Sequence, residues 1–203
     1  MMKAIVLLTF VASMWVAGPA HAVLVTFDEL ATNTDGAVIP DGYQGFDWSN
    51  WGVTSTTAGG YGPGTVSGLN VSYNRFGNAA SFSAASVFTV NSLYATAGWN
   101  DDSQVTFSGW ANGSVVDTRT VSPSATAPTL YALDWSGIDT FMVEVTGGTH
   151  HAGDNYVGDG PFVAIDNVTV NGVLAPVPEP GTCALMLAGL AAVGLATRRR
   201  TLA

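Results

Sequence analysis

Residues 138–146 read Ile-Asp-Thr-Phe-Met-Val-Glu-Val-Thr, and this stretch indicates the fold class. Successive side chains of an extended chain point to opposite faces of a sheet. One face of this segment therefore carries Phe141, Val143 and Val145. The opposite face carries Thr140, Met142 and Glu144. The alternation predicts a half-buried β-strand.

Short segments of the same kind recur on both sides of this strand, and turn residues separate them. Between Asn112 and Gly113 the sequence favours a type I′ hairpin turn, because both residues tolerate positive φ. Residues 23–175 show no sustained helical period and no internal repeat. We therefore predict one all-β domain over 23–175, a two-sheet jelly-roll β-sandwich. The expected strands are 23–27, 86–98, 104–110, 114–121, 130–135, 138–146 and 161–170.

The N-terminus has the features of a secretory signal peptide. Met1-Met2-Lys3 is a short basic start, and residues 4–17 are apolar. Ala20-His21-Ala22 forms an A-x-A cleavage site. We expect residues 1–22 to form a signal helix that signal peptidase removes.

The C-terminus combines three features in a fixed order. Pro178, Glu179 and Pro180 precede an uncharged apolar span at 182–197, and Arg198, Arg199 and Arg200 follow it. A helix of this span would be roughly 24 Å long, which is short for a hydrocarbon core of about 30 Å. The arginines favour retention on the cytoplasmic side. We therefore predict a short transmembrane helix within residues 176–203.

This tail resembles the PEP-CTERM sorting signal of Gram-negative bacteria, which is also known as the ice-binding protein C-terminal domain, a name that implies nothing about ice. The resemblance implies recognition by an exosortase that cuts near Pro178–Pro180. It also implies a transient inner-membrane intermediate, followed by delivery to the cell surface or to an extracellular (biofilm) matrix.

Charge and cysteine content restrict the function of the body. Fourteen of the 15 acidic residues lie within 23–175, together with only two basic residues, Arg75 and Arg119. A charge of about −12 repels phosphate backbones, so we expect no nucleic-acid partner. The single cysteine, Cys183, lies in the predicted span, so the body forms no disulfide of its own.

Three segments of the body resemble the galactose-binding-like jelly rolls of secreted proteins, a group that includes carbohydrate-binding modules. They are residues 25–29, 92–99 and 162–170. The resemblance implies neighbouring first and last strands, with a structural Ca²⁺ held by Asp28 or Glu29 together with Asp166. Carboxylate oxygens suit Ca²⁺. In the alternative interpretation Asp166 and Asn167 cap a bulge, and Asp28 is a solvated turn residue.

Two aromatic segments are candidates for sugar binding, because flat rings stack on sugars while polar neighbours bind hydroxyl groups. The first contains Tyr43, Trp48 and Trp51. Alternatively, Phe46, Trp48 and Trp51 belong to the core. The second contains Trp99, Asp101 and Asp102, just beyond a predicted strand, where a sandwich presents its loops.

The longest polar gap, 149–160, contains His150, His151, Asp154 and Asp159, in a spacing that matches no zinc signature. No nucleophile elbow, metalloprotease helix or phosphate loop occurs in the sequence. We therefore expect a non-enzymatic, exported protein that binds glycan or exopolysaccharide. The alternatives are a purely structural matrix protein and a glycoside hydrolase, which would need two carboxylates such as Glu29 and Glu144.

Overall fold

The computed structural model describes residues 22–32 and 36–171 of the chain. Most of these residues are in strands, and three short 3₁₀ helices interrupt them. The strands are β1 (Ala22–Val25), β2 (Ala37–Val38), β3 (Asp47–Ser49), β4 (Trp51–Ser55), β5 (Asn70–Asn74), β6 (Ala80–Ala97), β7 (Asn100–Asp101), β8 (Gln104–Ala111), β9 (Ser114–Val121), β10 (Thr129–Thr146), β11 (Thr149–His150) and β12 (Val163–Asn171). The 3₁₀ helices are η1 (Tyr43–Gly45), η2 (Gly59–Gly64) and η3 (Arg75–Gly77).

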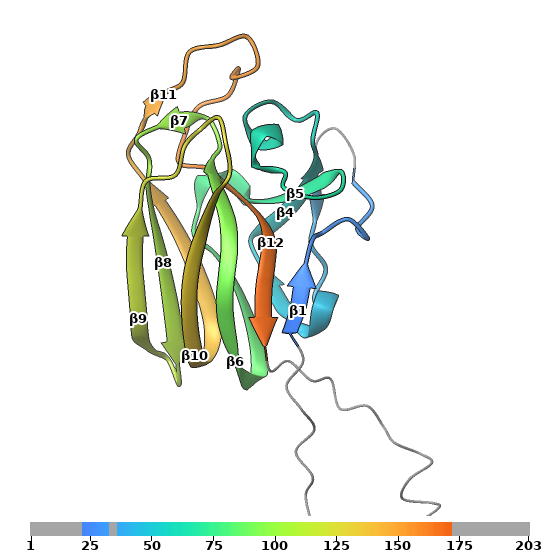
Figure 1. Ribbon diagram of the computed structural model, residues 1–203, viewed down its shortest axis with the longest axis vertical. Helices are drawn as coiled ribbons and strands as arrows, with labels where there is room; N and C mark the ends of the chain where they lie inside the picture. The colour runs from blue at the N-terminus through green and yellow to red at the C-terminus, as the bar shows by residue number, and fades with distance from the viewer. Residues whose placement is uncertain (1–21, 33–35, 172–203) are drawn as a thin grey trace, which may run out of the picture.

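Two long strands, β6 and β10, organise the domain. Each is 18 residues long, and they pair with each other antiparallel. Their register shifts three times between Ala132 and Thr140, and Gly137 takes a φ of +74°, which glycine adopts without strain. Bulges of this kind bend strands. The two halves of β6 and of β10 therefore enter different layers (Figure 1).

One layer has the order β3, the first half of β6, the second half of β10, β8 and β9. In the other layer, the first half of β10 pairs with the second half of β6, which pairs with β12. On the side of β12 away from β6, the later residues of β12 pair with β1, and its earlier residues pair with β5. β4 pairs with β5, and β2 pairs with β4. The chain is an all-β sandwich, as the sequence predicts.

Aromatic side chains fill the space between the layers. Phe46 lies 5.0 Å from both Phe82 and Phe88, centroid to centroid, and Phe82 lies 5.1 Å from Phe141. Phe46, Phe82, Phe88 and Phe141 are buried. Burying a side chain of this size contributes about 1.5–3 kcal/mol. The sandwich therefore has a substantial core without any disulfide.

Several local predictions are confirmed. Asn112 and Gly113 both have positive φ between β8 and β9, as a type I′ turn requires. The predicted face of Phe141, Val143 and Val145 is buried. The prediction of two strands at 130–135 and 138–146 is wrong, because a bulged β10 runs through both segments.

The two ends of the described domain are adjacent. Ala22 in β1 pairs with Asn171 in β12, so the first and last strands are neighbours. Both residues lie at the end of the sandwich opposite β7, β11 and η2 (Figure 1). We call the end that carries β7, β11, η2 and the 151–160 loop the loop end. Of the signal helix predicted at residues 1–22, only Ala22 is described, and it lies in β1; the rest, and the span predicted at 182–197, lie outside the described residues. Within the described part, none of the helices is long and apolar enough to cross a membrane.

Candidate functional site

The predicted sugar platform at Tyr43, Trp48 and Trp51 is wrong, and the alternative of a core segment is confirmed. Trp51 is fully buried and Trp48 is 7% exposed. The Trp48 indole donates a hydrogen bond to the Tyr43 carbonyl oxygen, and its ring packs edge-on against Phe27. The two tryptophans therefore have no ring face available for a ligand.

Tyr43 also has a structural contact. Its hydroxyl group donates a 2.7 Å hydrogen bond to Oε2 of Glu29. Burial is the largest cause that raises the pKa of Tyr43 above its usual value, and the Glu29 carboxylate raises it further. The hydroxyl group therefore stays protonated. Glu29 is thereby drawn toward η1.

Trp99, the aromatic residue of the second predicted sugar-binding segment, lies at the loop end just after β6. Its ring packs edge-on against Tyr61 at 5.2 Å. A Cβ atom at Gly59 or at Gly158 would come within 2.6 Å of the indole ring. Only glycine allows the backbones of η2 and the 151–160 loop to approach the indole this closely. The glycines of η2 and of this loop therefore position Trp99 between the two segments.

Two adjacent depressions open beside Trp99. The first has a volume of about 240 Å³, and its lining includes the rings of Tyr61, Tyr73 and Trp99. Tyr61 and Tyr73 are stacked with centroids 4.5 Å apart. The remaining lining residues are Thr54, Ala58, Gly59 and Val157. The lining of this depression thus combines aromatic rings with hydroxyl groups.

The second depression has a volume of about 420 Å³ and is more polar. It is lined by Thr56, Thr57, Gly59, Gly62, Pro63, Asn155 and Tyr156. Gly59 lines both depressions, so the two share one wall. We call the pair the loop-end groove. Its described lining contains no Asp, Glu, Lys, Arg or His, although the body carries a large negative charge.

Burial also affects the chemistry of Tyr61 in this groove. Desolvation raises the pKa of its hydroxyl above the usual value, while a hydrogen bond with the Trp99 side chain lowers it by a smaller amount. The Tyr61 hydroxyl therefore stays neutral and protonated over the physiological range. A neutral hydroxyl both donates and accepts hydrogen bonds, as a polyhydroxylated ligand requires.

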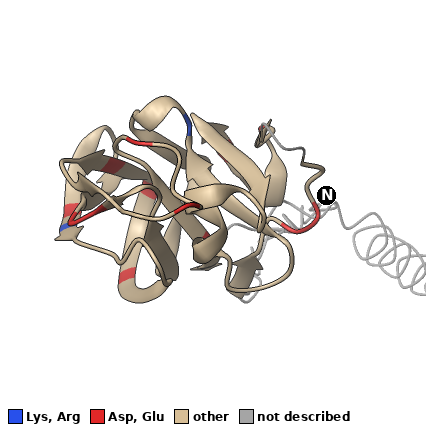
Figure 2. Ribbon diagram, turned by 90° about the horizontal axis from the view of Figure 1, so that it is seen from above, with Lys and Arg blue, Asp and Glu red and all other residues tan. Residues whose placement is uncertain are grey.

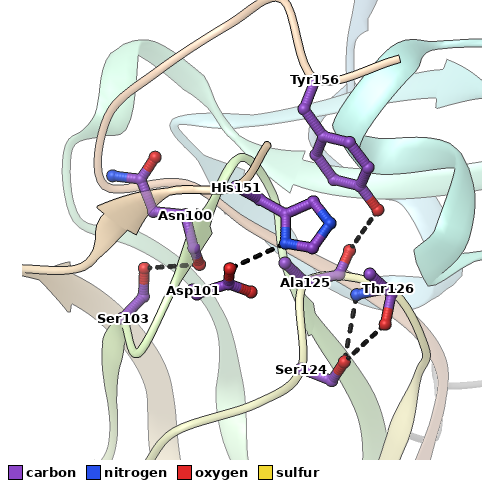
Figure 3. Close-up of polar contacts among 8 residues, drawn as sticks. All are labelled: Asn100, Asp101, Ser103, Ser124, Ala125, Thr126, His151 and Tyr156. Carbon is purple, nitrogen blue, oxygen red and sulfur yellow. Dashed lines mark hydrogen bonds and ion pairs between the residues drawn. The ribbon is translucent and has the colours of Figure 1, made fainter. Parts of the chain in front are cut away.

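The predicted residue Asp101 fastens the 151–160 loop, as Figure 3 shows. Its Oδ2 lies 2.7 Å from Nδ1 of His151. The His151 ring packs on Tyr156 at 4.4 Å, and the Tyr156 hydroxyl donates a 2.8 Å hydrogen bond to the Ala125 carbonyl oxygen. Asp101 thus supports one wall of the loop-end groove without lining it. Asp102 is exposed, with a φ of +59°, and its carbonyl oxygen accepts a hydrogen bond from Gln104.

The carboxylates of Asp28 and Asp166, the residues predicted to hold Ca²⁺, both accept hydrogen bonds from the loop at residues 66–70. Oδ2 of Asp166 accepts hydrogen bonds from the backbone N–H groups of Val66 and Ser67, and its Oδ1 accepts one from Asn167. Oδ1 of Asp28 accepts from the N–H groups of Leu69 and Asn70. We call this arrangement the carboxylate clasp.

The carboxylate clasp does not have the donor set of a calcium cage. Five backbone N–H groups face the two carboxylates, whereas Ca²⁺ needs oxygen ligands. Glu29 is bound to Tyr43 instead. Among the residues that the structure describes, no three His, Cys, Asp or Glu side chains form a group that could hold a metal ion. The acidic residues are also dispersed in the view onto the loop end (Figure 2). Calcium binding stays a prediction, and these contacts do not favour it.

The alternative interpretation of Asp166 is confirmed. The register between β12 and β6 shifts between Asp166 and Thr169, and Asn167 takes a φ of +49° at this bulge. Asp166 is fully buried there. Desolvation raises its pKa to about 6, against the lowering effect of its three backbone hydrogen bonds, and the nearby Asp28 charge adds to the increase.

Sequence reasoning found Trp99 but missed most of the groove. The residues it missed are Thr54, Thr56, Thr57, Tyr61, Tyr73, Asn155 and Tyr156. One signal was available in Gly59-Gly60-Tyr61-Gly62-Pro63-Gly64, because closely spaced glycines around an aromatic residue indicate a close backbone approach.

The fold has relatives among solved structures. A crystal structure of a DUF4465 family protein from Bacteroides ovatus matches 76% of this chain and 100% of its own, with a TM-score of 0.50 and 8% sequence identity. The structure of TmCBM61 in complex with β-1,4-galactotriose matches 64% of this chain and 93% of its own, with a TM-score of 0.35 and 12% identity. The first match shows a shared fold alone. A search of curated proteins gives no match.

The tail of the sequence matches a family model. Residues 176–200 match the PEP-CTERM protein-sorting motif. The predicted sorting residues, Pro178 to Pro180 and Arg198 to Arg200, fall within this match, outside the described residues. The chain therefore carries the sorting signal of exported proteins that exosortases process.

Proposed function

We propose that this exported chain displays a non-catalytic β-sandwich that binds a neutral glycan in the loop-end groove. The observation that carries the proposal is the lining of the groove. Four aromatic residues, Tyr61, Tyr73, Trp99 and Tyr156, lie beside threonine and asparagine side chains, and the described lining contains no charged side chain. Stacking surfaces combined with neutral hydrogen-bonding groups suit pyranose rings and their hydroxyl groups.

The position of the groove supports this proposal. Ala22 and Asn171, where the described domain begins and ends, lie at the opposite end of the sandwich from the groove. The chain therefore leaves the described domain at the end away from the groove. This geometry suits a protein at the cell surface or in the extracellular matrix of a Gram-negative bacterium, with an extracellular polysaccharide as its partner.

The distribution of carboxylates supports a binding role over hydrolysis. Glycoside hydrolases place two carboxyl groups on either side of the scissile bond. Neither depression of the loop-end groove is lined by a carboxylate in the described chain. Glu144 is exposed on β10, and Glu29 is bound to Tyr43.

The test is a panel of neutral and acidic oligosaccharides, applied to the chain recovered from cells that export it. We expect binding to neutral hexose oligosaccharides. The double variant Thr57→Ala with Asn155→Ala removes two hydrogen-bonding groups from the rim of the groove, so affinity should fall about tenfold. Ser86→Ala, an exposed change in β6 near its bend, is the matched control and should bind like wild type.

Two outcomes would reject this function. One is the absence of binding to every neutral oligosaccharide while the chain is folded. The other is unchanged affinity in the double variant, because the ligand would then bind elsewhere on the molecule.

A further inference from the structure

Strand β9 forms one outer edge of the sandwich. It pairs with β8 from Ser114 opposite Ala111 to Val121 opposite Val105, with a register shift that leaves Val116 unpaired. On its other side no strand pairs with it in the described chain, and Figure 1 shows it at the margin of the sheet. An edge strand presents alternate N–H and C=O groups that another strand can pair with. Eight residues form a long edge for such pairing.

The protection of this edge is limited to its first half, where a bulge leaves Val116 without a partner on β8, and from Asp117 to Val121 the pairing is regular. Its sequence, Ser-Val-Val-Asp-Thr-Arg-Thr-Val, contains neither proline nor lysine, and it forms regular pairs with β8 over most of its length. Val115 and Val116 are 49% and 52% exposed. The edge is thus partly apolar and open.

The charges of β9 are self-complementary. In an antiparallel pair of two β9 strands related by a two-fold axis at Thr118, each Asp117 faces an Arg119 of the second copy. The same register places Val116, at the bulge, opposite Thr120. Opposite charges at facing positions stabilise a strand pair, whereas like charges destabilise it. The sequence around Thr118 therefore favours one register with a second copy of itself.

Arg119 reaches from this edge to the first half of β10. Its guanidinium lies 5.5 Å from the centre of the Tyr131 ring and donates a 2.9 Å hydrogen bond to the Ala132 carbonyl oxygen. This contact orients one side of the guanidinium. A guanidinium has five N–H donors, so others remain for a facing carboxylate. On a second copy, the carboxylate of Asp117 would accept hydrogen bonds from these donors.

We propose that two copies of this chain associate through β9, forming an antiparallel edge-to-edge pair centred on Thr118. One strand edge buries less than the 1,200 Å² or so of a typical stable interface, so the pair is weak and forms at high local concentration. Crowding at a cell surface or in a matrix supplies that condition. β9 is separate from both the loop-end groove and the β1–β12 ends, so pairing leaves them free.

The test uses single cysteines in full-length chains that carry Cys183→Ser. Directly facing residues of an antiparallel pair have Cα atoms about 4.5–5.5 Å apart, which is within disulfide range. Thr118→Cys should therefore give a cross-linked dimer on non-reducing gels of oxidised cells. Val116→Cys or Thr120→Cys alone should not, because each would face the other position. When these two variants are expressed together they should cross-link.

Charge reversal supplies the second measurement, in the Thr118→Cys background. Asp117→Arg places like charges opposite each other at two symmetric positions, so the cross-linked fraction should fall about tenfold. Asp117→Arg combined with Arg119→Asp should restore it. Thermal unfolding of each variant confirms that the fold is retained. Equal cross-linking at positions 116, 118 and 120, or no recovery in a folded double reversal, would overturn the proposal.

Discussion

Asp166 gives the chain a pH-dependent stability that one substitution can isolate. The carboxyl group is fully buried, and desolvation raises its pKa from 3.8 to about 6. In the unfolded chain the group regains its ordinary value. Between about pH 4 and pH 6 the folded state therefore binds a proton that the unfolded state has released.

The sign and size of the effect follow from this difference. Where the folded state binds more protons, the free energy of unfolding falls as pH rises. At about 1.4 kcal/mol per pKa unit, the interval from 3.8 to about 6 corresponds to a loss of about 3 kcal/mol. The contribution of Asp166 is therefore largest below pH 4, and it is lost as pH rises through about 6.

Asp166→Asn removes this titration while keeping the shape of the side chain. We would measure urea unfolding of both chains by tryptophan fluorescence at pH 4, 5, 6 and 7. The stability of wild type relative to Asp166→Asn should fall by about 2.4 kcal/mol from pH 4 to pH 7, because the unfolded group is already partly ionised at pH 4. Other titrating groups are shared by the two chains and cancel. A difference that stays constant from pH 4 to pH 7 would refute the reasoning.

Three further outcomes test the core, a strained turn and the carboxylate clasp. Trp51→Ala should cost about 3–5 kcal/mol of stability in urea unfolding, because it empties a fully buried site, and a small effect would place Trp51 outside the core. Phe76→Gly should raise stability by about 1 kcal/mol in the same assay, because Phe76 is 72% exposed and has a φ of +58°; a loss of stability would reveal an important contact of its ring. Addition of EDTA should leave the melting temperature unchanged, because backbone N–H groups occupy the carboxylate clasp, and a clear decrease would restore the calcium prediction.

The sequence predicted strands where apolar alternation is regular and missed them where buried positions are polar. β5 contains Asn70, Ser72 and Asn74, all of them buried. Long-range hydrogen bonds satisfy the two asparagines: Nδ2 of Asn70 donates to the Phe27 carbonyl oxygen, and Nδ2 of Asn74 donates to that of Pro161. Such partners come from distant segments, so a local pattern cannot indicate them.

The site was less predictable than the fold for a related reason. Trp99 was a candidate because it follows a strand, but its neighbours come from residues 54–63, from Tyr73 and from residues 155–157. Only the packing of η2 against the 151–160 loop brings these segments together. The segment around Trp48 and Trp51 has the aromatic and polar composition of a sugar-binding platform. Both rings are nevertheless buried, and their burial depends on the packing of the whole sandwich.

The pairing of β12 has a mechanical consequence. A force applied to the chain after Asn171 acts on the end of β12, which is a central strand, and is directed along the axis of that strand. β12 is bonded to β6 on one side, and to β5 and β1 on the other. Tension would therefore load many backbone hydrogen bonds at once, in shear, and would not peel them apart one by one. The sandwich can therefore resist a force that acts between its last strand and its loop end.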